Sequence, residues 1–406
     1  MGVSRPPGTG GGNDGAPLVI WGAGAMGGSI GAALVDAGHD VLFVDQDRDH
    51  VAAMNRDGLR ITGPVVEATV PAMAVHPDQV EGTFSTILLC VKAHHTAGAV
   101  AQLAPHLADE GAVVSIQNGL CELEIADALE TRRTIGAFVN FGADYLGPGV
   151  IHRGNRGAVV VGELDGADTP RIREIHGLLK TFEPDAVLTD NIFGFLWGKL
   201  AYAALLFATA LTDESIADVL DSRSHRRLMR AIGREVVGVA LARGVKLKGF
   251  DGFDPEAFRP PGVGAGSQGG VGADAVDVEP GSEALSARDG ADPAGSPDGS
   301  MAALDARADA SLDDLVSFNR ASAKTHSGIW RDLAVRKRPT EVDAQLGAVV
   351  RIGKGLGVPT PLTEGIVRRI HEIERGERAQ AWENLDELEL EISNGMADNQ
   401  GLTTKG

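Results

Sequence analysis

The chain has 406 residues, of which 43% are hydrophobic and 4% aromatic, and its formal net charge is −19. This length allows two domains of ordinary size, each with its own core. The negative charge excludes a general affinity for nucleic acid or an anionic membrane, because neither polyanion would attract the chain. Two cysteines are too few for a disulfide framework and fit a reducing compartment, so we expect a cytoplasmic protein.

The N-terminal segment leads into a strand, a glycine-rich turn and a helix. Residues 1–16 lack the apolar segment of a secretory signal, and we expect them to be a disordered leader. An apolar run, Pro17–Trp21, then enters the turn Gly22–Gly27, which opens a helix of small residues. A second strand, Asp40–Val44, ends directly before Asp45.

Strand, glycine turn, helix, strand and acid in this order are the arrangement of a dinucleotide-binding domain. The first glycine permits the tight turn, the second lets the backbone approach the pyrophosphate, and the third lets helix and strand pack closely. The helix N-terminus also offers N–H groups to the phosphates. The turn residues that we predict to bind the cofactor are Gly22, Ala23, Gly24, Ala25, Met26 and Gly27.

Asp45 bears on the choice of cofactor. A carboxylate at the end of the second strand accepts hydrogen bonds from both ribose hydroxyls of NAD and repels the additional phosphate of NADP. Arg48, three residues later, could pair with that phosphate instead. The residues therefore favour NAD and leave NADP open.

Two more strands carry polar residues just past their ends. Nearly continuous apolar runs predict buried parallel strands over Thr83–Val91 and Gly111–Ile116. Ligands of open α/β sheets bind at the carboxyl ends of the strands. We therefore expect Lys92 and Asn118 at a ligand cleft; a solvated loop charge and a turn residue before Gly119 are the respective alternatives.

The rest of the first domain is expected to contain two antiparallel strands within Gly136–Glu163, a helix over Thr169–Phe182 and a short strand over Ala186–Thr189. This places the dinucleotide-binding domain at residues 17–189. His94 and His95 invite a metal site, but no carboxylate lies nearby in the sequence to complete one, so we expect no metal.

The stretch Asp190–Asp213 contains two helix lengths of apolar and small residues with a single charge, Lys199. Because burying an unpaired charge is unfavourable, Lys199 must be paired, line a cleft or take part in chemistry. The alternative is a lysine that extends to the surface from a core helix. A membrane span is disfavoured, since Lys199 lies well inside the stretch and no second candidate span exists.

The second half contains helical patterns and no strand patterns, so residues 190–395 are predicted to form a helical domain. Helices are expected over Ser224–Arg243, Leu304–Lys324, Val342–Lys354 and Pro359–Arg375. Residues from about 255 to 302 are rich in Gly, Ala, Pro, Ser and acids, and we expect a disordered acidic insertion there. Residues 396–406 are expected to be a frayed tail.

Five segments, in this order, resemble the ketopantoate reductase family. They are Gly22–Gly27, Val91–His94, Gln117–Gly119, Trp197–Leu200 and Ser327–Asp343. The resemblance spans Leu18 to Arg375 without the insertion. It implies an N-terminal Rossmann-type doubly wound α/β domain, a C-terminal all-α domain, and NAD(P)H-dependent reduction of a 2-oxo acid to a 2-hydroxy acid, as in pantothenate biosynthesis.

The resemblance also implies roles for individual residues. Lys199 matches the catalytic lysine, and Glu341 matches a glutamate that contacts both the cofactor and the active site. From the residues alone, Glu341 is instead an acid in the first turn of a helix capped by Thr340.

Four further positions match cofactor or substrate contacts of the family. Lys92 and Asn118 match residues near the nicotinamide and the substrate. Gly142 falls where a backbone contact to the cofactor is expected, and Ser327 falls near the family's substrate-binding serine. Asn118 is accordingly predicted to contact both ligands.

Two departures from the family pattern leave the substrate and the cofactor open. The family usually carries asparagines one and two helical turns after the lysine, where this chain has Ala203 and Phe207, so we predict a more apolar substrate pocket. Asp45 argues against NADPH, the typical cofactor of the family.

The first prediction is therefore 2-dehydropantoate 2-reductase, and the alternative is an NAD-dependent D-2-hydroxyacid dehydrogenase with a more apolar substrate. A non-catalytic dinucleotide-binding protein is a third hypothesis. The sequence does not determine the oligomeric state, although helical domains of this kind often pair as homodimers.

Overall fold

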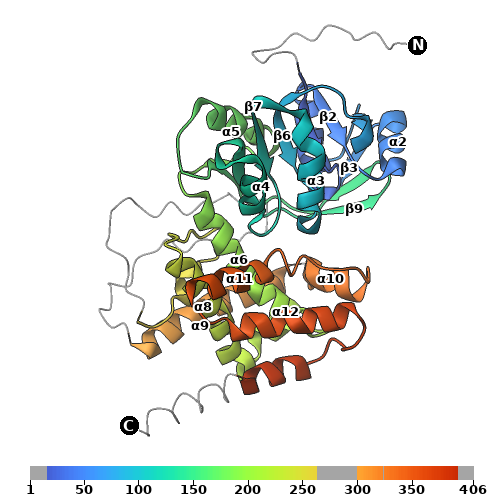
Figure 1. The fold of residues 1–406 in the computed structure, drawn as a ribbon. Coiled ribbons are helices and arrows are strands. Elements are labelled where there is room, and N and C mark those ends of the chain that lie inside the picture. The colour runs from blue at the N-terminus through green and yellow to red at the C-terminus, as the bar shows by residue number, and fades with distance from the viewer. Residues whose placement is uncertain (1–15, 263–299, 323, 392–406) are drawn as a thin grey trace, which may run out of the picture.

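The computed structural model describes residues 16–262, 300–322 and 324–391. Within these residues a Rossmann-type domain and a helical domain are joined by α6 (Ile192–Thr209), which runs from the edge of the sheet into the helical domain (Figure 1). This confirms the predicted fold class. The predicted leader up to residue 15, residues 263–299 of the insertion and the tail lie outside the described residues.

The main sheet of the described chain has the strand order β12-β11-β8-β7-β6-β1-β2-β5. Neighbouring strands are parallel except β8 and β11, which are antiparallel. The strands are β1 (Leu18–Trp21), β2 (Val41–Val44), β5 (Met73–Val75), β6 (Phe84–Leu89), β7 (Leu107–Ser115), β8 (Thr134–Val139), β11 (Val159–Glu163) and β12 (Val187–Leu188). The winding reverses at β1, which lies between β2 and β6, so a ligand crevice is expected at its carboxyl end.

Helices cover both faces of this sheet, as Figure 1 shows. They are α1 (Ala25–Asp36), α2 (Arg48–Asp57), α3 (Thr96–Leu103), α4 (Cys121–Leu129) and α5 (Pro170–Phe182). α3 ends at Leu103 and the chain continues as the 3-10 turn Ala104–His106, because Pro105 cannot continue an α-helix.

The segment Gly136–Glu163 contains the predicted antiparallel pair as a hairpin, together with two further strands that the prediction missed. Its ends form β8 and β11 of the main sheet, which pair with each other across an intervening hairpin. The hairpin, β9 (Ala143–Gly147) and β10 (Val150–Arg153), belongs to a second sheet with the order β4-β3-β10-β9. That sheet is completed by β3 (Leu59–Thr62) and β4 (Ala68–Val70).

In the helical domain, α6 is packed on nearly all sides. It is long and apolar enough to cross a membrane by length and composition, yet 78% of it is buried inside the fold. The predicted apolar face of α8, formed by Leu228, Ile232, Val236 and Val239, is fully buried. The helices around α6 are α7 (Ile216–Asp221), α8 (Arg226–Ala242), α9 (Met301–Ala321), α10 (Gly328–Ala334), α11 (Leu346–Leu356) and α12 (Pro361–Glu374).

Two expectations for this half were wrong. Residues 255–262 were assigned to the disordered insertion, but Pro255–Phe258 forms the 3-10 helix η6, whose Phe258 is fully buried against α8. The aromatic side chain supplies the apolar area that the surrounding composition lacks. The helix predicted from Val342 begins only at Leu346, because residues 341–345 form a turn.

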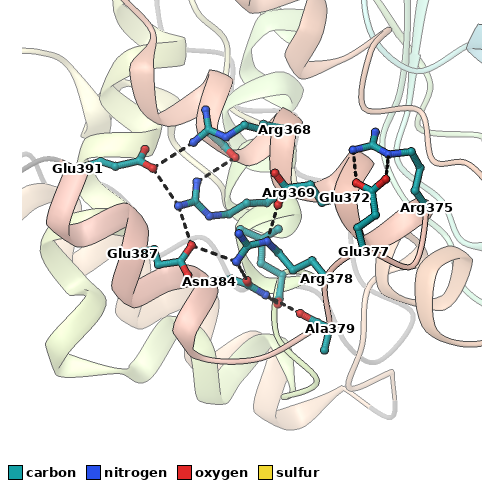
Figure 2. Close-up of polar contacts among 12 residues, drawn as sticks. Arg368, Arg369, Glu372, Arg375, Glu377, Arg378, Ala379, Asn384, Glu387 and Glu391 are labelled. Carbon is teal, nitrogen blue, oxygen red and sulfur yellow. Dashed lines mark hydrogen bonds and ion pairs between the residues drawn. The ribbon is translucent and has the colours of Figure 1, made fainter.

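An arginine–glutamate network ties α12 to the helical residues 383–391 (Figure 2). Arg369, only 3% exposed, donates to Glu387 at 3.2 Å and to Glu391 at 2.9 Å. Arg378 donates to Asn384 and Glu387 from the loop between the two helices. This network closes the far end of the helical domain, away from the sheet.

Candidate active site

A cavity of about 800 Å³ lies between the carboxyl edge of the main sheet and the helical domain. Most of the predicted site residues line it. They are Gly22, Gly24, Ala25, Met26, Asp45, Lys92, Asn118, Gly142, Lys199, Ala203, Ser327 and Glu341. Ala23, Gly27 and Phe207 are not among the lining residues.

The glycine turn forms one end of the cavity. Gly22 has a φ of +98°, which favours glycine, and a Cβ at Gly24 would meet no atom within 4 Å. A Cβ at Gly27 would lie 2.1 Å from the Gly22 carbonyl oxygen, so Gly27 allows helix and strand to pack closely. The open backbone at Gly24 and the free N–H groups at the start of α1 fit a dinucleotide pyrophosphate.

Two acids and a histidine surround the turn. One carboxylate oxygen of Asp45 accepts from the Ala23 N–H at 2.8 Å and the other from the Asp47 N–H at 2.9 Å. Gly149 donates its N–H to His50 Nδ1 at 2.9 Å, so Nε2 carries the hydrogen and donates to the Ala23 carbonyl at 2.9 Å. The backbone of Ala23 thus holds the turn through its bonds to Asp45 and His50, and Ala23 does not line the cavity.

Lys199, Asn118 and Glu341 meet at the centre of the cavity. The Lys199 ammonium donates to Asn118 Oδ1 at 2.8 Å and to the Val139 carbonyl at 2.6 Å. Asn118 Nδ2 donates to Glu341 Oε2 at 2.9 Å. The other oxygen of Glu341 accepts the Ala93 N–H at 2.8 Å, and Lys92 Nζ lies 3.4 Å from Oε2.

The electrostatics of this cluster poise the lysine for proton transfer. Burial lowers the pKa of Lys199 to about 8, although the carboxylates of Glu341, Glu122 and Asp251 act in the opposite direction. The pKa of Glu341 is lowered, because the attraction of Lys92 and the hydrogen bonds from Ala93, Asn118 and Lys92 outweigh the opposing effect of burial. Glu341 is therefore ionised. It lies in the turn before α11 and lines the cavity, so it is not an acid in the first turn of a helix.

The cavity continues along one face of α6. Lys199, Tyr202, Ala203 and Leu206 line it at the spacing of three and four residues that shares a helix face. Phe207 is fully buried in the core of the helical domain instead. The expectation that Phe207 lines the pocket is thus corrected: eight residues after Lys199 the helix has turned past the cavity, and Leu206 takes that place.

α10 and the turn after it form the opposite wall, which contributes several lining residues that sequence reasoning missed. Ser327 caps α10 by accepting the Trp330 N–H at 3.1 Å. Arg331 and Arg336 donate to the two carboxylate oxygens of Asp144 in β9, at 3.1 and 2.8 Å, and so bridge the two domains. Arg338 pairs with the buried Asp332.

The turn Arg336–Arg338 therefore contributes two arginines to ion pairs with Asp144 and Asp332. The signal that could have found these residues is the acid Asp332 at helical spacing from Arg336. Among the described residues, no group of three or more His, Cys, Asp or Glu side chains could hold a metal ion.

Comparison with known proteins gives consistent matches to both domains. A family model for ketopantoate reductase PanE/ApbA matches residues 18–166, and the model for the C-terminal part of the same family matches residues 191–374. The 2-dehydropantoate 2-reductase of Halobacterium salinarum is 26% identical over 234 residues, which is 57% of this chain and 77% of that protein. The corresponding protein of Pyrococcus abyssi is 31% identical over 188 residues, or 45% of this chain and 59% of the relative.

Solved structures share the fold. A ternary complex of D-mandelate dehydrogenase with NADH and anilino(oxo)acetate has a TM-score of 0.68 at 19% identity, covering 89% of this chain and 99% of the other. A PanE/ApbA family ketopantoate reductase from Ralstonia eutropha has a TM-score of 0.65 at 24% identity, with the same coverage.

The two domains and the lysine in the cleft between them define an NAD(P)-dependent oxidoreductase. The matched models cover most of the chain and both of its domains. The chain belongs to the ketopantoate reductase family.

Proposed function

We propose that this protein reduces a 2-oxo acid to a 2-hydroxy acid with a nicotinamide dinucleotide. The observation that carries the proposal is the Lys199 ammonium, held by Asn118 and Val139 in the same cavity as the glycine turn. As charge develops on the substrate carbonyl oxygen, the ammonium stabilises it and gives up a proton. A nicotinamide bound in this cleft would supply the hydride.

The neighbouring residues hold the lysine and receive the substrate. Asn118 accepts from Lys199 and donates to Glu341, so its amide is fixed in one orientation between them. The Ser327 hydroxyl accepts the helix-cap bond and keeps its own hydrogen, which can be donated to a substrate carboxylate. Lys92, 44% exposed at the cavity wall, adds positive charge for the same carboxylate.

We propose NAD as the preferred cofactor. Asp45 and Asp47 both line the cavity beside the glycine turn, where a ribose 2′-phosphate would meet two carboxylates. Arg48, which could have paired with that phosphate, donates instead to Asp78 at 2.8 Å and is not a lining residue. The arrangement supports NAD over NADP.

2-Dehydropantoate is the first candidate substrate, because relatives of this chain in Halobacterium salinarum and Pyrococcus abyssi are 2-dehydropantoate 2-reductases. A second candidate, an aromatic or branched 2-oxo acid, is favoured by the wall that Tyr202, Ala203, Leu206 and Ile329 contribute to the cavity that contains Lys199. This wall replaces the polar groups that would bind the hydroxyl of 2-dehydropantoate. Both substrates use the same chemistry at Lys199.

We also propose a cytoplasmic location and a homodimer. A cytoplasmic location is supported by the two free cysteines, and cell fractionation would test it. A homodimer is supported by the shared fold of a dimeric ketopantoate reductase from Staphylococcus aureus, which has a TM-score of 0.61 at 18% identity. Analytical ultracentrifugation would test it.

The experiment for the reaction is a matrix of substrates and cofactors. Oxidation of NADH and of NADPH is measured with 2-dehydropantoate, phenylpyruvate and a branched 2-oxo acid. We expect turnover with NADH and at least one of the acids. If 2-dehydropantoate does not react and an apolar acid does, the second candidate replaces the first. If no acid oxidises either cofactor although the cofactor binds, the proposed function is wrong.

A further inference from the structure

Asp251 belongs to the helical domain but bonds to the main sheet. It lies between α8 and η6, and its Oδ2 accepts Asn140 Nδ2 at 2.6 Å and the Ala158 N–H at 3.4 Å. Asn140 in turn donates its N–H to the Ala158 carbonyl at 2.9 Å. One carboxylate thus joins the residue after β8 to the residue before β11.

The end of β8 is also the place where Lys199 is held. The carbonyl of Val139, the last residue of β8, accepts the Lys199 ammonium at 2.6 Å. Asn140, the next residue, lines the cavity and is the partner of Asp251. A shift of this strand end would therefore move one of the two oxygens that orient the ammonium.

The backbone at Asp251 supports a specific role. Its φ is +44°, a left-handed conformation that few residues other than glycine adopt, although aspartate and asparagine tolerate it. Phe250 and Phe253, each 3% exposed, exchange backbone hydrogen bonds on either side and fix the loop in this shape. The anchored loop holds the carboxylate against the sheet, and such conformations persist where the surroundings determine them.

The charges that face Lys199 come from three separate elements. Glu341 lies in the turn before α11 and is itself faced by Lys92, while Glu122 lies at the start of α4 and Asp251 in the loop before η6. Burial raises the pKa of Glu122 to about 8, so this group is mostly neutral at pH 7. Burial also raises the pKa of Asp251, against the hydrogen bonds from Asn140 and Ala158 and the attraction of Lys199.

We propose that Asp251 is a positioning residue for Lys199, acting through Asn140 and the end of β8. The carboxylate fixes the strand end whose carbonyl holds the ammonium, and its charge favours the protonated lysine. This inference rests on the proposed function, because it assumes that Lys199 performs the proton transfer. No part of the resemblance to the reductase family involves Asp251.

Two variants separate the geometry from the charge. Asp251→Asn tolerates the left-handed backbone and keeps a hydrogen-bond acceptor, but it removes the charge. Asp251→Gly keeps the backbone conformation and removes both the hydrogen-bond acceptor and the charge. Asp254→Asn is the matched control, since Asp254 lies three residues later in the same loop, caps η6 and pairs with the exposed Arg307.

The measurement combines turnover with chemical labelling of Lys199. The pH dependence of lysine acetylation, read by mass spectrometry, needs no substrate. We expect Asp251→Asn to keep most of the turnover but to label at lower pH, since the lysine loses a favourable charge. Asp251→Gly should lower kcat roughly tenfold or more, because the ammonium is displaced, with little change in the KM for the cofactor.

Wild-type kcat in Asp251→Gly, together with unmoved labelling in both variants, would overturn the inference. Equal effects in Asp254→Asn would also overturn it, since they would show a general loop defect. A wild-type enzyme that reduces no 2-oxo acid would instead contradict the proposed function, while the labelling curves would still decide whether Asp251 acts on Lys199.

Discussion

Asn118 joins the two charged residues of the site because an amide presents a different group to each. Its carbonyl oxygen faces the Lys199 ammonium and its NH₂ faces the Glu341 carboxylate. An aspartate in its place would set a second carboxylate against Glu341, and an apolar residue would leave buried polar groups unsatisfied. The three residues come from β7–α4, α6 and the turn before α11, so the site exists only when both domains are in contact.

The pH dependence of turnover follows from the lysine. Burial lowers the pKa of Lys199 to about 8. In the proposed mechanism Lys199 donates the proton, so the rate of 2-oxo acid reduction should be full below this pKa and should fall as the pH rises through about 8. Steady-state kcat as a function of pH tests this. A rate that stays level up to the ordinary lysine pKa of 10.5 would contradict the assignment.

Asp45 gives a second test at the scale of one residue. Asp45→Ser removes the carboxylate that we propose would repel a 2′-phosphate, so the ratio of kcat/KM for NADH to that for NADPH should fall roughly tenfold, the effect of about 1.4 kcal/mol of charge repulsion. Asp49→Ser is the control, since Asp49 lies on the exposed surface of α2 outside the cavity. An unchanged ratio in Asp45→Ser would mean that other residues select the cofactor.

At the level of the element, the rotation of α6 decides which of its side chains line the cavity. Ala203 lies one turn after Lys199 on the cavity face, whereas Phe207 has rotated into the core. Ala203→Asn places an amide beside the lysine. The ratio of kcat/KM for 2-dehydropantoate to that for an apolar 2-oxo acid should rise roughly tenfold, since one polar contact changes discrimination by this order.

Phe207→Leu is the control for that experiment, because a core substitution should leave the substrate ratio unchanged while lowering stability by about 1 kcal/mol. If both variants leave the ratio at its wild-type value, the α6 face does not select the substrate.

The network of α12 gives an element-scale prediction for stability (Figure 2). Arg369→Ala removes a buried guanidinium with three hydrogen-bond partners and should lower the free energy of unfolding by about 1.5–3 kcal/mol. Arg368→Ala, whose side chain is 54% exposed, should cost less than about 1 kcal/mol. Urea unfolding of both variants measures this, and equal losses would show that burial is not the deciding factor.

At the scale of the whole molecule, the sequence predicted what depends on local chemistry. The glycine turn, the strand ends at Lys92 and Asn118 and the apolar face of α8 follow from spacing and residue type, and the structure places them as expected. It also confirms a Rossmann-type domain followed by a helical one.

Contacts between distant segments could not be predicted. Asp144 pairs with Arg331 and Arg336 almost two hundred positions away, and Asp251 bonds to Asn140 from the other domain. Neither pairing leaves a periodic signal in the chain. The prediction that Phe207 lines the pocket failed for a related reason. Counting helical turns from Lys199 does not show how far along α6 the cavity extends, and this depends on contacts with distant segments.

The role of Lys199 as the proton donor in 2-oxo acid reduction is tested by single-turnover oxidation of bound NADH in Lys199→Ala. The substrate is the acid that the wild-type enzyme turns over best, and circular dichroism with NADH titration checks that the fold and cofactor binding are intact. We expect a rate lower by roughly a hundredfold or more, the size of a general-acid contribution. A folded variant that binds NADH and reduces the acid at nearly the wild-type rate would contradict this role.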